Sequence, residues 1–220
     1  MNTQTYYQEF SRQIDRVFSS HPQSFDHRSH HPWLTGALGD PFVGIWFIAE
    51  NPSLRMVERA TNPGGGPPTY EAQWYESRGD KLFREMLVKH GFKSGGVDTL
   101  GGWHCYVTNV IKEADYANRW NAKSQAERNQ VAEVWSPVLS WELINSHPKL
   151  VVIMGGKTYI ELNHLVRQSL ITLPETMKVT HYAYIGQRPK GKLGPMHPQR
   201  IQEYDQEFSD VANLFHQLNK

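Results

Sequence analysis

The chain alternates short apolar runs with longer segments of helical periodicity, and this order limits the folds that it can adopt. The apolar runs, each short enough to be one buried strand, are Val43–Ala49, His104–Val110, Leu150–Met154 and Val179–Ile185. Helical patterns cover about residues 4–19 and then Gly79–His90, Ser124–Asn145, Lys157–Arg167 and Ile201–Leu218. Buried strands that alternate with helices indicate a mostly parallel sheet with helices on both faces.

The length and the charge fit one globular domain. The 220 residues include 23 lysines and arginines against 22 acidic residues, which gives a net charge of +1. With 39% hydrophobic and 20% charged residues, the chain is neither a polybasic tail nor an acidic disordered segment. We expect a single domain over residues 1–220 that acts as a monomer, with an N-terminal helical extension to about residue 40.

The single cysteine, Cys105, excludes intrachain disulfides, iron–sulfur clusters with four thiolate ligands and Cys-x-x-Cys zinc sites. This cysteine usage fits a reducing compartment. The N-terminal residues contain no apolar signal-peptide core, and the longest apolar runs are far short of the roughly 20 residues that a bilayer requires. We therefore expect a cytoplasmic protein without a membrane span.

Polar residues follow the first two predicted strands. Glu50 and Asn51 come after the first strand, where Pro52 favours an extended Asn51, and the second strand ends at Asn109. Ligands of parallel sheets bind beyond the carboxyl ends of the strands, so these three polar residues are candidates for one site. On local chemistry alone, Asn51 can equally be a helix cap, and Asn109 can be a loop residue with a satisfied amide.

The segment from Thr176 to Gln202 contains no acidic residue. Its basic residues are Lys178, Arg188, Lys190, Lys192 and Arg200. Such a segment can form a surface that contacts phosphates, or it can be a solvated loop. His197 lies in the same segment between Pro195 and Pro198, which restrict its backbone and suit an imidazole that must be aimed.

An aromatic stretch with Tyr70, Trp74 and Tyr75 precedes the second helical pattern. Aromatic faces can stack on a nucleobase, although aromatic residues are also ordinary core material. The glycine- and proline-rich residues 64–68 upstream lack the GxxxxGK[ST] pattern of a phosphate loop. Nothing in this region indicates an ATPase.

Taken in order, these pieces resemble the uracil-DNA glycosylase superfamily over about Val43 to Asp210. Its members carry a G-x-[DN]-P or G-E-x-P-G motif, an aromatic residue before a helix, a strand ending in T-N, a helix leading into an apolar strand, and an H-P motif before the terminal helix. The matching stretches are AENPS (49–53), Trp74 with GDKLFREML (79–87), YVTNVIK (106–112), HPKLVVIMGGKTYIEL (147–162) and MHPQR (196–200). The resemblance implies a three-layer α/β/α sandwich with a four-stranded, mainly parallel sheet.

The resemblance also implies roles for the candidate catalytic residues. By position, either Asn51 or Glu50 handles the attacking water, because the superfamily places its water-handling residue in the first motif. Asn109 matches the asparagine that reads the edge of a pyrimidine. His197 matches the histidine that bonds to the carbonyl oxygen of the departing base. Ala49 stands where the family carries glycine, and this leaves the choice of base open.

Further residues are implied in contacts with the base and with DNA. Trp74 falls where family members place the aromatic residue that stacks on the base, and Tyr75 is a near competitor. Gln199 and Arg200 occupy the place of the loop that probes the DNA helix. The expected DNA-binding residues are Arg188, Lys190, Lys192, Gln199 and Arg200.

We therefore expect a monofunctional DNA glycosylase that flips a uracil-like or modified base out of DNA, hydrolyses its N-glycosidic bond and leaves an abasic site. Its partner is DNA with a flipped target base. This chemistry requires no metal or organic cofactor, because it is a hydrolysis assisted by hydrogen bonds and charge. Two alternatives stay open, a non-catalytic base-binding module of the same fold and a hydrolase of small nucleosides.

Overall fold

The computed structural model of the protein describes residues 1–21, 37–55, 77–186 and 197–220. Its strands are β1 (Leu38–Gly39), β2 (Ile45–Ala49), β3 (Tyr106–Asn109), β4 (Leu150–Met154) and β5 (Glu175–Val179). Its helices are α1 (Thr3–Ser20), α3 (Arg78–Lys89), α4 (Ala117–Ala122), α5 (Gln125–Ser146), α6 (Gly156–Arg167), α7 (Tyr182–Ile185) and α8 (Pro198–Leu218). No helix in these ranges is long and apolar enough to cross a membrane.

The strands form one sheet in the order β1-β3-β2-β4-β5. β2 pairs in parallel with both β3 and β4, β4 pairs in parallel with β5, and β1 is antiparallel to β3. The sheet is mostly parallel, as predicted, but it has five strands instead of the expected four. β1 was missed because two residues are too few to form a recognisable apolar run.

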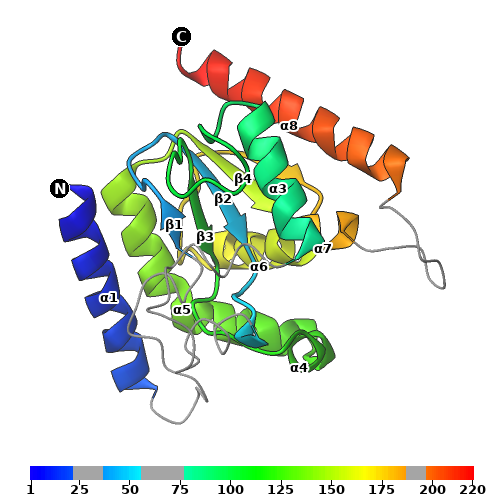
Figure 1. Ribbon diagram of the computed structural model, residues 1–220. Coiled ribbons are helices and arrows are strands. Elements are labelled where there is room, and N and C mark those ends of the chain that lie inside the picture. Colours follow the sequence, from blue (N-terminus) through cyan, green and yellow to red (C-terminus); the bar gives the residue numbers. More distant parts are fainter. Residues whose placement is uncertain (22–36, 56–76, 187–196) are drawn as a thin grey trace, which may run out of the picture.

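Helices cover both faces of the sheet, which makes the predicted α/β/α sandwich (Figure 1). Successive side chains of a strand point to opposite faces. On β2, Trp46 and Ile48 therefore pack in a core with α1, α5 and α6, whereas Ile45 and Phe47 pack in a second core with α3, α7 and α8. Both cores are continuous with the sheet, so the carboxyl ends of its strands are held by buried contacts on each side.

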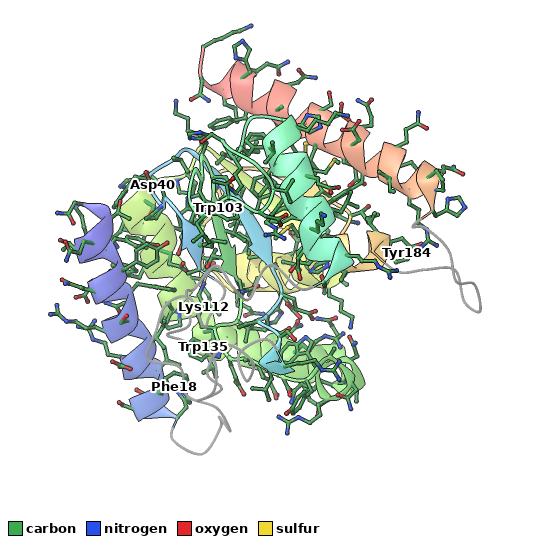
Figure 2. All side chains as sticks on the ribbon, viewed as in Figure 1. Phe18, Asp40, Trp103, Lys112, Trp135 and Tyr184 are labelled. Atoms are coloured by element: carbon green, nitrogen blue, oxygen red, sulfur yellow. The ribbon has the colours of Figure 1, made fainter. Side chains whose placement is uncertain are left out.

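The N-terminal helix α1 lies along α5 and contributes to the first core (Figures 1 and 2). Tyr6 and Phe10 are fully buried. The ring of Phe18 meets Trp135 of α5 edge-on, with the ring centroids 5.4 Å apart. The Tyr7 hydroxyl donates a hydrogen bond to the Gly39 carbonyl at 2.8 Å, which links α1 to β1.

The predicted strand Val179–Ile185 is wrong. In the structure β5 ends at Val179, and the short helix α7 begins at Tyr182. Among the described strands β5 lies at the edge and pairs with β4 alone. Most of its side chains are exposed, so it carries no apolar run that a sequence pattern could show. The other predicted strands and all five predicted helices are confirmed to within a few residues.

A buried ion pair joins α5 to the segment that follows β3, and Figure 2 labels its lysine, Lys112. Lys112 Nζ lies 2.5 Å from Glu142 Oε2, and both side chains are fully buried. The hydroxyls of Tyr106 and Thr108 donate to Glu142 Oε1 at 2.9 and 3.0 Å. Lys112 also donates to the Asn109 carbonyl at 2.5 Å. The ion pair therefore fixes the backbone at the end of β3, where the predicted site residue Asn109 lies.

Candidate active site

The candidate site lies at the carboxyl ends of the parallel strands, and its first residues come from β2 and β3. β2 and β3 are adjacent, and Ala49 pairs with Asn109. Glu50 and Asn51 follow directly after β2, so they lie beside the end of β3. Adjacent parallel strands thus bring together residues that are far apart in the sequence.

The segments after β2 and β3 continue side by side beyond the sheet. Ile111 N–H donates to the Glu50 carbonyl at 3.0 Å, and Leu54 N–H donates to the Asp115 carbonyl at 3.0 Å. A bridge between Ser53 and Asp115 extends this pairing. The backbone carbonyl of Glu50 is therefore held by a β-type hydrogen bond, which limits its freedom.

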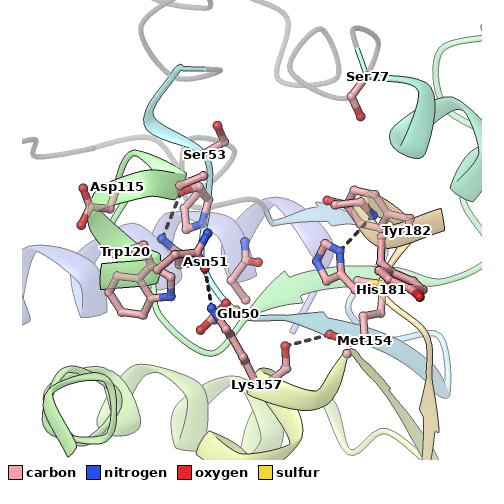
Figure 3. Close-up of a pocket in the computed structure, with 18 of the residues that line it drawn as sticks. Glu50, Asn51, Ser53, Ser77, Asp115, Trp120, Met154, Lys157, His181 and Tyr182 are labelled. Carbon is pink, nitrogen blue, oxygen red and sulfur yellow. Dashed lines mark hydrogen bonds between the residues drawn. The ribbon is translucent and has the colours of Figure 1, made fainter. Parts of the chain in front are cut away.

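These strand ends open into a cavity of about 620 Å³ (Figure 3). Glu50, Asn51 and Asn109 all line it. Further parts of its wall come from Gly155, Gly156 and Lys157, which follow β4, and from His181–Tyr184, which follow β5. A volume of this size is in the range of small-molecule sites and can take a nucleobase with its sugar.

Glu50 and Asn51 differ in their surroundings. Glu50 is part of a charged cluster, because its Oε1 lies 3.8 Å from Nε of Arg128 on α5. The Asn51 side chain makes a long contact with the Pro52 carbonyl, to which its Nδ2 donates at 3.4 Å. A carboxylate can stabilise a nearby cation, whereas an amide can orient water or a ligand, so the two neighbours offer different chemistry to the cavity.

His181 is a residue of the cavity wall that we did not predict. It caps α7, and its Nδ1 accepts a hydrogen bond from Ala183 N–H at 3.1 Å (Figure 3). A ring nitrogen that accepts cannot carry the proton, so the proton lies on Nε2 and this nitrogen is a donor. Burial lowers the pKa of His181 to about 4. At neutral pH His181 therefore offers the site an uncharged hydrogen-bond donor.

Gly155 allows His181 to approach the end of β4. Its φ is +94°, and a Cβ at this position would lie 3.0 Å from the Cβ of His181. A side chain on Gly155 would be both strained and too close to the imidazole. The residue after β4 must therefore be glycine for the histidine to occupy this place.

Asp80 adds a titratable group to the cavity wall from α3. Burial raises the pKa of Asp80 to about 6, although hydrogen bonds from Ser77 and Tyr182 act in the opposite direction. The carboxyl group of Asp80 therefore changes its charge near neutral pH, unlike the imidazole of His181.

The neutral state of His181 can be measured directly. Because the native pKa is depressed, we expect the imidazole to remain the Nε2–H tautomer at about pH 5.5, where a histidine with the usual pKa of about 6.5 is mostly protonated. Long-range ¹H–¹⁵N NMR spectra, assigned with His181→Gln, report the tautomer. A His181 resonance that titrates with a midpoint near the usual value would contradict this description of the site.

His197 does not take the place that we expected for it. It is exposed at the N-cap of α8 and is not among the residues that line the cavity. Asn51 and Asn109 thus line one cavity, whereas His197 is not among its described lining residues, and the roles proposed for all three stay predictions. β5 ends earlier than the predicted strand, and His181 lies just after its end and lines the cavity.

The start of α8 still reaches the rim of the cavity. The guanidinium of Arg200 lies 4.4 Å from the ring centroid of Tyr184, and Tyr184 lines the cavity. Gln199 is exposed, and its side-chain amide donates to Glu203 at 2.9 Å. Arg200 is thus beside the site, whereas Gln199 faces solvent.

Five of the predicted residues lie outside the described part of the chain. They are the aromatic candidates Trp74 and Tyr75 and the basic candidates Arg188, Lys190 and Lys192. Their proposed contacts stay predictions. In the described ranges, no group of three or more histidine, cysteine, aspartate or glutamate residues could hold a metal ion.

The family model of the uracil DNA glycosylase superfamily matches residues 37–209. The chain belongs to this superfamily. The matched region runs from just before β1 into α8, so it includes the whole sheet and the cavity and leaves out α1. A comparison with curated proteins gave no match.

Membership of the uracil DNA glycosylase superfamily agrees with the resemblance seen in the motifs. The AENPS and TN stretches, on which the resemblance depends, are the ones that place Glu50, Asn51 and Asn109 in the cavity. The MHPQR stretch does not contribute its histidine to the cavity wall. His181 is the histidine that reaches the cavity, and the sequence carries no signal for it, because it falls inside the predicted strand Val179–Ile185.

Proposed function

We propose that the protein is a DNA glycosylase that hydrolyses the N-glycosidic bond of a uracil-like or modified base flipped out of DNA. The observation that carries the proposal is the shared cavity at three strand ends. Glu50 and Asn51 follow β2, Asn109 ends β3, and His181 follows β5, and all four line the same cavity. We propose that these residues orient the attacking water, bind the edge of the base and stabilise the departing base.

Asn109 is the group we propose for reading the base. A side-chain amide offers an acceptor oxygen and two donor hydrogens, and the edge of uracil presents a carbonyl acceptor beside an N–H donor. One amide can therefore satisfy two adjacent groups of the base. Support for this role comes from the fixed backbone of Asn109, whose carbonyl accepts from the buried Lys112.

His181 is the group we propose for the departing base, in place of His197. When the bond between the sugar C1′ and the base nitrogen breaks, both electrons leave with the base, and negative charge collects on its carbonyl oxygen. A neutral Nε2–H can donate a hydrogen bond to that oxygen. The donor stays in place at neutral pH because burial lowers the pKa of His181 to about 4.

Glu50 and Asn51 are proposed to act on the opposite side, at the sugar. Bond cleavage leaves a sugar oxocarbenium ion, which the negative charge of Glu50 stabilises. Asn51 orients the water whose oxygen then bonds to C1′, and a proton of that water passes to Glu50 or to solvent. The departing base takes up a proton in exchange, so the products are the free base and an abasic site, and atoms and charge balance without a further reactant.

DNA contacts are proposed at the rim of the cavity. Arg200 is placed there by its contact with Tyr184. Arg188, Lys190 and Lys192 lie in the segment between Tyr184 and Arg200 in the sequence, and their charges suit phosphates. We propose that the protein binds DNA as a monomer through this basic segment.

The proposal is tested with oligonucleotides that each carry one uracil, 5-hydroxymethyluracil or hypoxanthine. We expect alkali to cleave the strand at the altered base after incubation with the protein, and no cleavage before alkali. A Glu50→Gln/Asn51→Ala variant is the control and leaves the strand intact. Binding without abasic sites on any oligonucleotide would favour the non-catalytic alternative.

A nucleoside hydrolase is distinguished by its substrate and its response to salt. Such an enzyme would release the base from the free nucleoside at least as well as from DNA. A DNA glycosylase requires the backbone, and its DNA affinity falls with salt at a slope of about −0.9 per phosphate contact on duplex and about −0.7 on single strands. Equal activity on nucleoside and DNA would overturn the proposal.

A further inference from the structure

Two carboxyl groups, one of them from Glu50 in the cavity wall, flank one buried guanidinium. Nε of Arg128 lies 3.8 Å from Oε1 of Glu50 and 3.7 Å from Oε1 of Glu161 on α6. Arg128 is held from its other side, where its terminal nitrogens donate to the Lys123 carbonyl at 2.6 Å and to the Gln125 side chain at 2.8 Å. The guanidinium is thus fixed between the two carboxyl groups.

The cluster of Glu50, Arg128 and Glu161 can stabilise one negative charge but not two. One guanidinium compensates one carboxylate, and a second charged carboxylate beside the first would be both desolvated and repelled. The side chain of Glu161 is 0% exposed, whereas that of Glu50 is 16% exposed and borders the cavity. The better-solvated carboxyl group keeps the charge, so the proton belongs on Glu161.

The remaining charged group that acts on Glu161 does not change this balance. Lys157 of α6 attracts the Glu161 carboxylate, but its ammonium group donates to the side chain of Asn121. Burial and the neighbouring Glu50 together raise the pKa of Glu161 far above the usual value of a glutamate, against the opposing effects of Arg128 and Lys157.

We propose that Glu50 and Glu161 hold one proton between them at neutral pH, that Glu161 carries it, and that Glu161 thereby keeps the Glu50 carboxylate ionised beside the cavity. Glu161 is a positioning residue, since it does not line the cavity and acts through Glu50. The shared proton follows from the geometry of the cluster alone, whereas its value for base excision rests on the proposed function.

The shared proton has a consequence for stability that does not depend on activity. The native state keeps the proton of Glu161 well above pH 4.3, near which glutamates of the unfolded chain lose theirs. Above this pH the unfolded state therefore binds fewer protons than the native state, and the free energy of unfolding falls as the pH rises. A glutamine at position 161 cannot ionise, so it removes this dependence.

Thermal unfolding of the full chain tests the shared proton. We expect the melting temperature of Glu161→Gln, relative to the unmodified protein, to rise steadily between about pH 5 and pH 8. Glu203→Gln is the matched control, because Glu203 is exposed on α8, and its difference should stay constant. A constant difference for Glu161→Gln as well would overturn the proposal. A ¹³C NMR titration of the glutamate carboxyl groups needs no variant to fold, and a Glu161 signal of the ionised form at pH 7 would also overturn it.

The excision rate tests the role of Glu161 separately. Glu161→Ala removes the carboxyl group beside Glu50, and we expect an excision rate about tenfold lower, comparable to the loss of one buried hydrogen bond. Glu161→Gln, which keeps a donor in the same place, should restore most of the rate at neutral pH. Equal losses in both variants would overturn the positioning role. A protein that shows the pH-dependent melting difference but excises no base from any oligonucleotide would refute the proposed function and leave the shared proton standing.

Discussion

Glu50→Gln is expected to slow base excision by about two to three orders of magnitude, the usual cost of removing one group that stabilises charge in the transition state. Glutamine keeps the shape of Glu50 but removes the negative charge that faces the sugar cation. DNA binding should change little, since the charge acts mainly in the transition state. Single-turnover excision at saturating protein measures the chemical step, and a fluorescence binding assay measures the affinity.

A variant of Asn51 shows whether Glu50 or Asn51 handles the attacking water. Asn51→Ala should also reduce the rate, because the water loses its orientation. Glu133→Gln is the control for a lost carboxylate, because Glu133 is exposed on α5, contacts His164 of α6 and does not line the cavity. Unchanged rates in both Glu50→Gln and Asn51→Ala would mean that other groups handle the water. An equal loss of binding and rate in Asn51→Ala would favour its role as a structural residue after β2.

Lys112→Met is expected to destabilise the fold by about 3–5 kcal/mol, the range for a buried ion pair that loses one partner. Glu142 would then be left fully buried without its cation. Its pKa is raised by burial and lowered by Lys112, so without the lysine it is expected to take up a proton. Urea denaturation at about pH 5 and pH 8 should therefore show a smaller cost at the lower pH.

Two further variants complete this test. Lys149→Met removes an exposed lysine that contacts Asn219, and its effect should stay within about 0.5 kcal/mol. The double variant Lys112→Met/Glu142→Met removes both charges and should recover much of the lost stability. A cost for Lys112→Met as small as that of Lys149→Met would contradict the structural role of the pair.

The elements that could be predicted from the sequence are those with strong local patterns. β4 appears in full as Leu150–Met154, because it is central and apolar on both faces. β5 lies at the edge and carries Glu175 and Lys178 on exposed positions, so its boundary could not be found from hydrophobicity. The predicted strand therefore included His181, which in the structure lies just after β5 and lines the cavity.

In the candidate site too, the residues that could be predicted are those with a strong local pattern. Glu50, Asn51 and Asn109 could be placed at one edge of the sheet because they end or directly follow strands that the sequence shows clearly. The contacts of Glu50 with Arg128, and of Arg128 with Glu161, could not be predicted, since they depend on how α5 and α6 pack on the sheet. Buried charged residues carry no local pattern that separates them from exposed ones on an amphipathic helix.

The most direct measurement is the crystal structure of the slow variant Glu50→Gln bound to DNA that contains the base it excises. The account predicts a flipped base in the cavity, with its edge on the Asn109 amide and its carbonyl oxygen within hydrogen-bond distance of His181 Nε2. A base that stays stacked in the DNA, or that binds beside His197 at the start of α8, would contradict it.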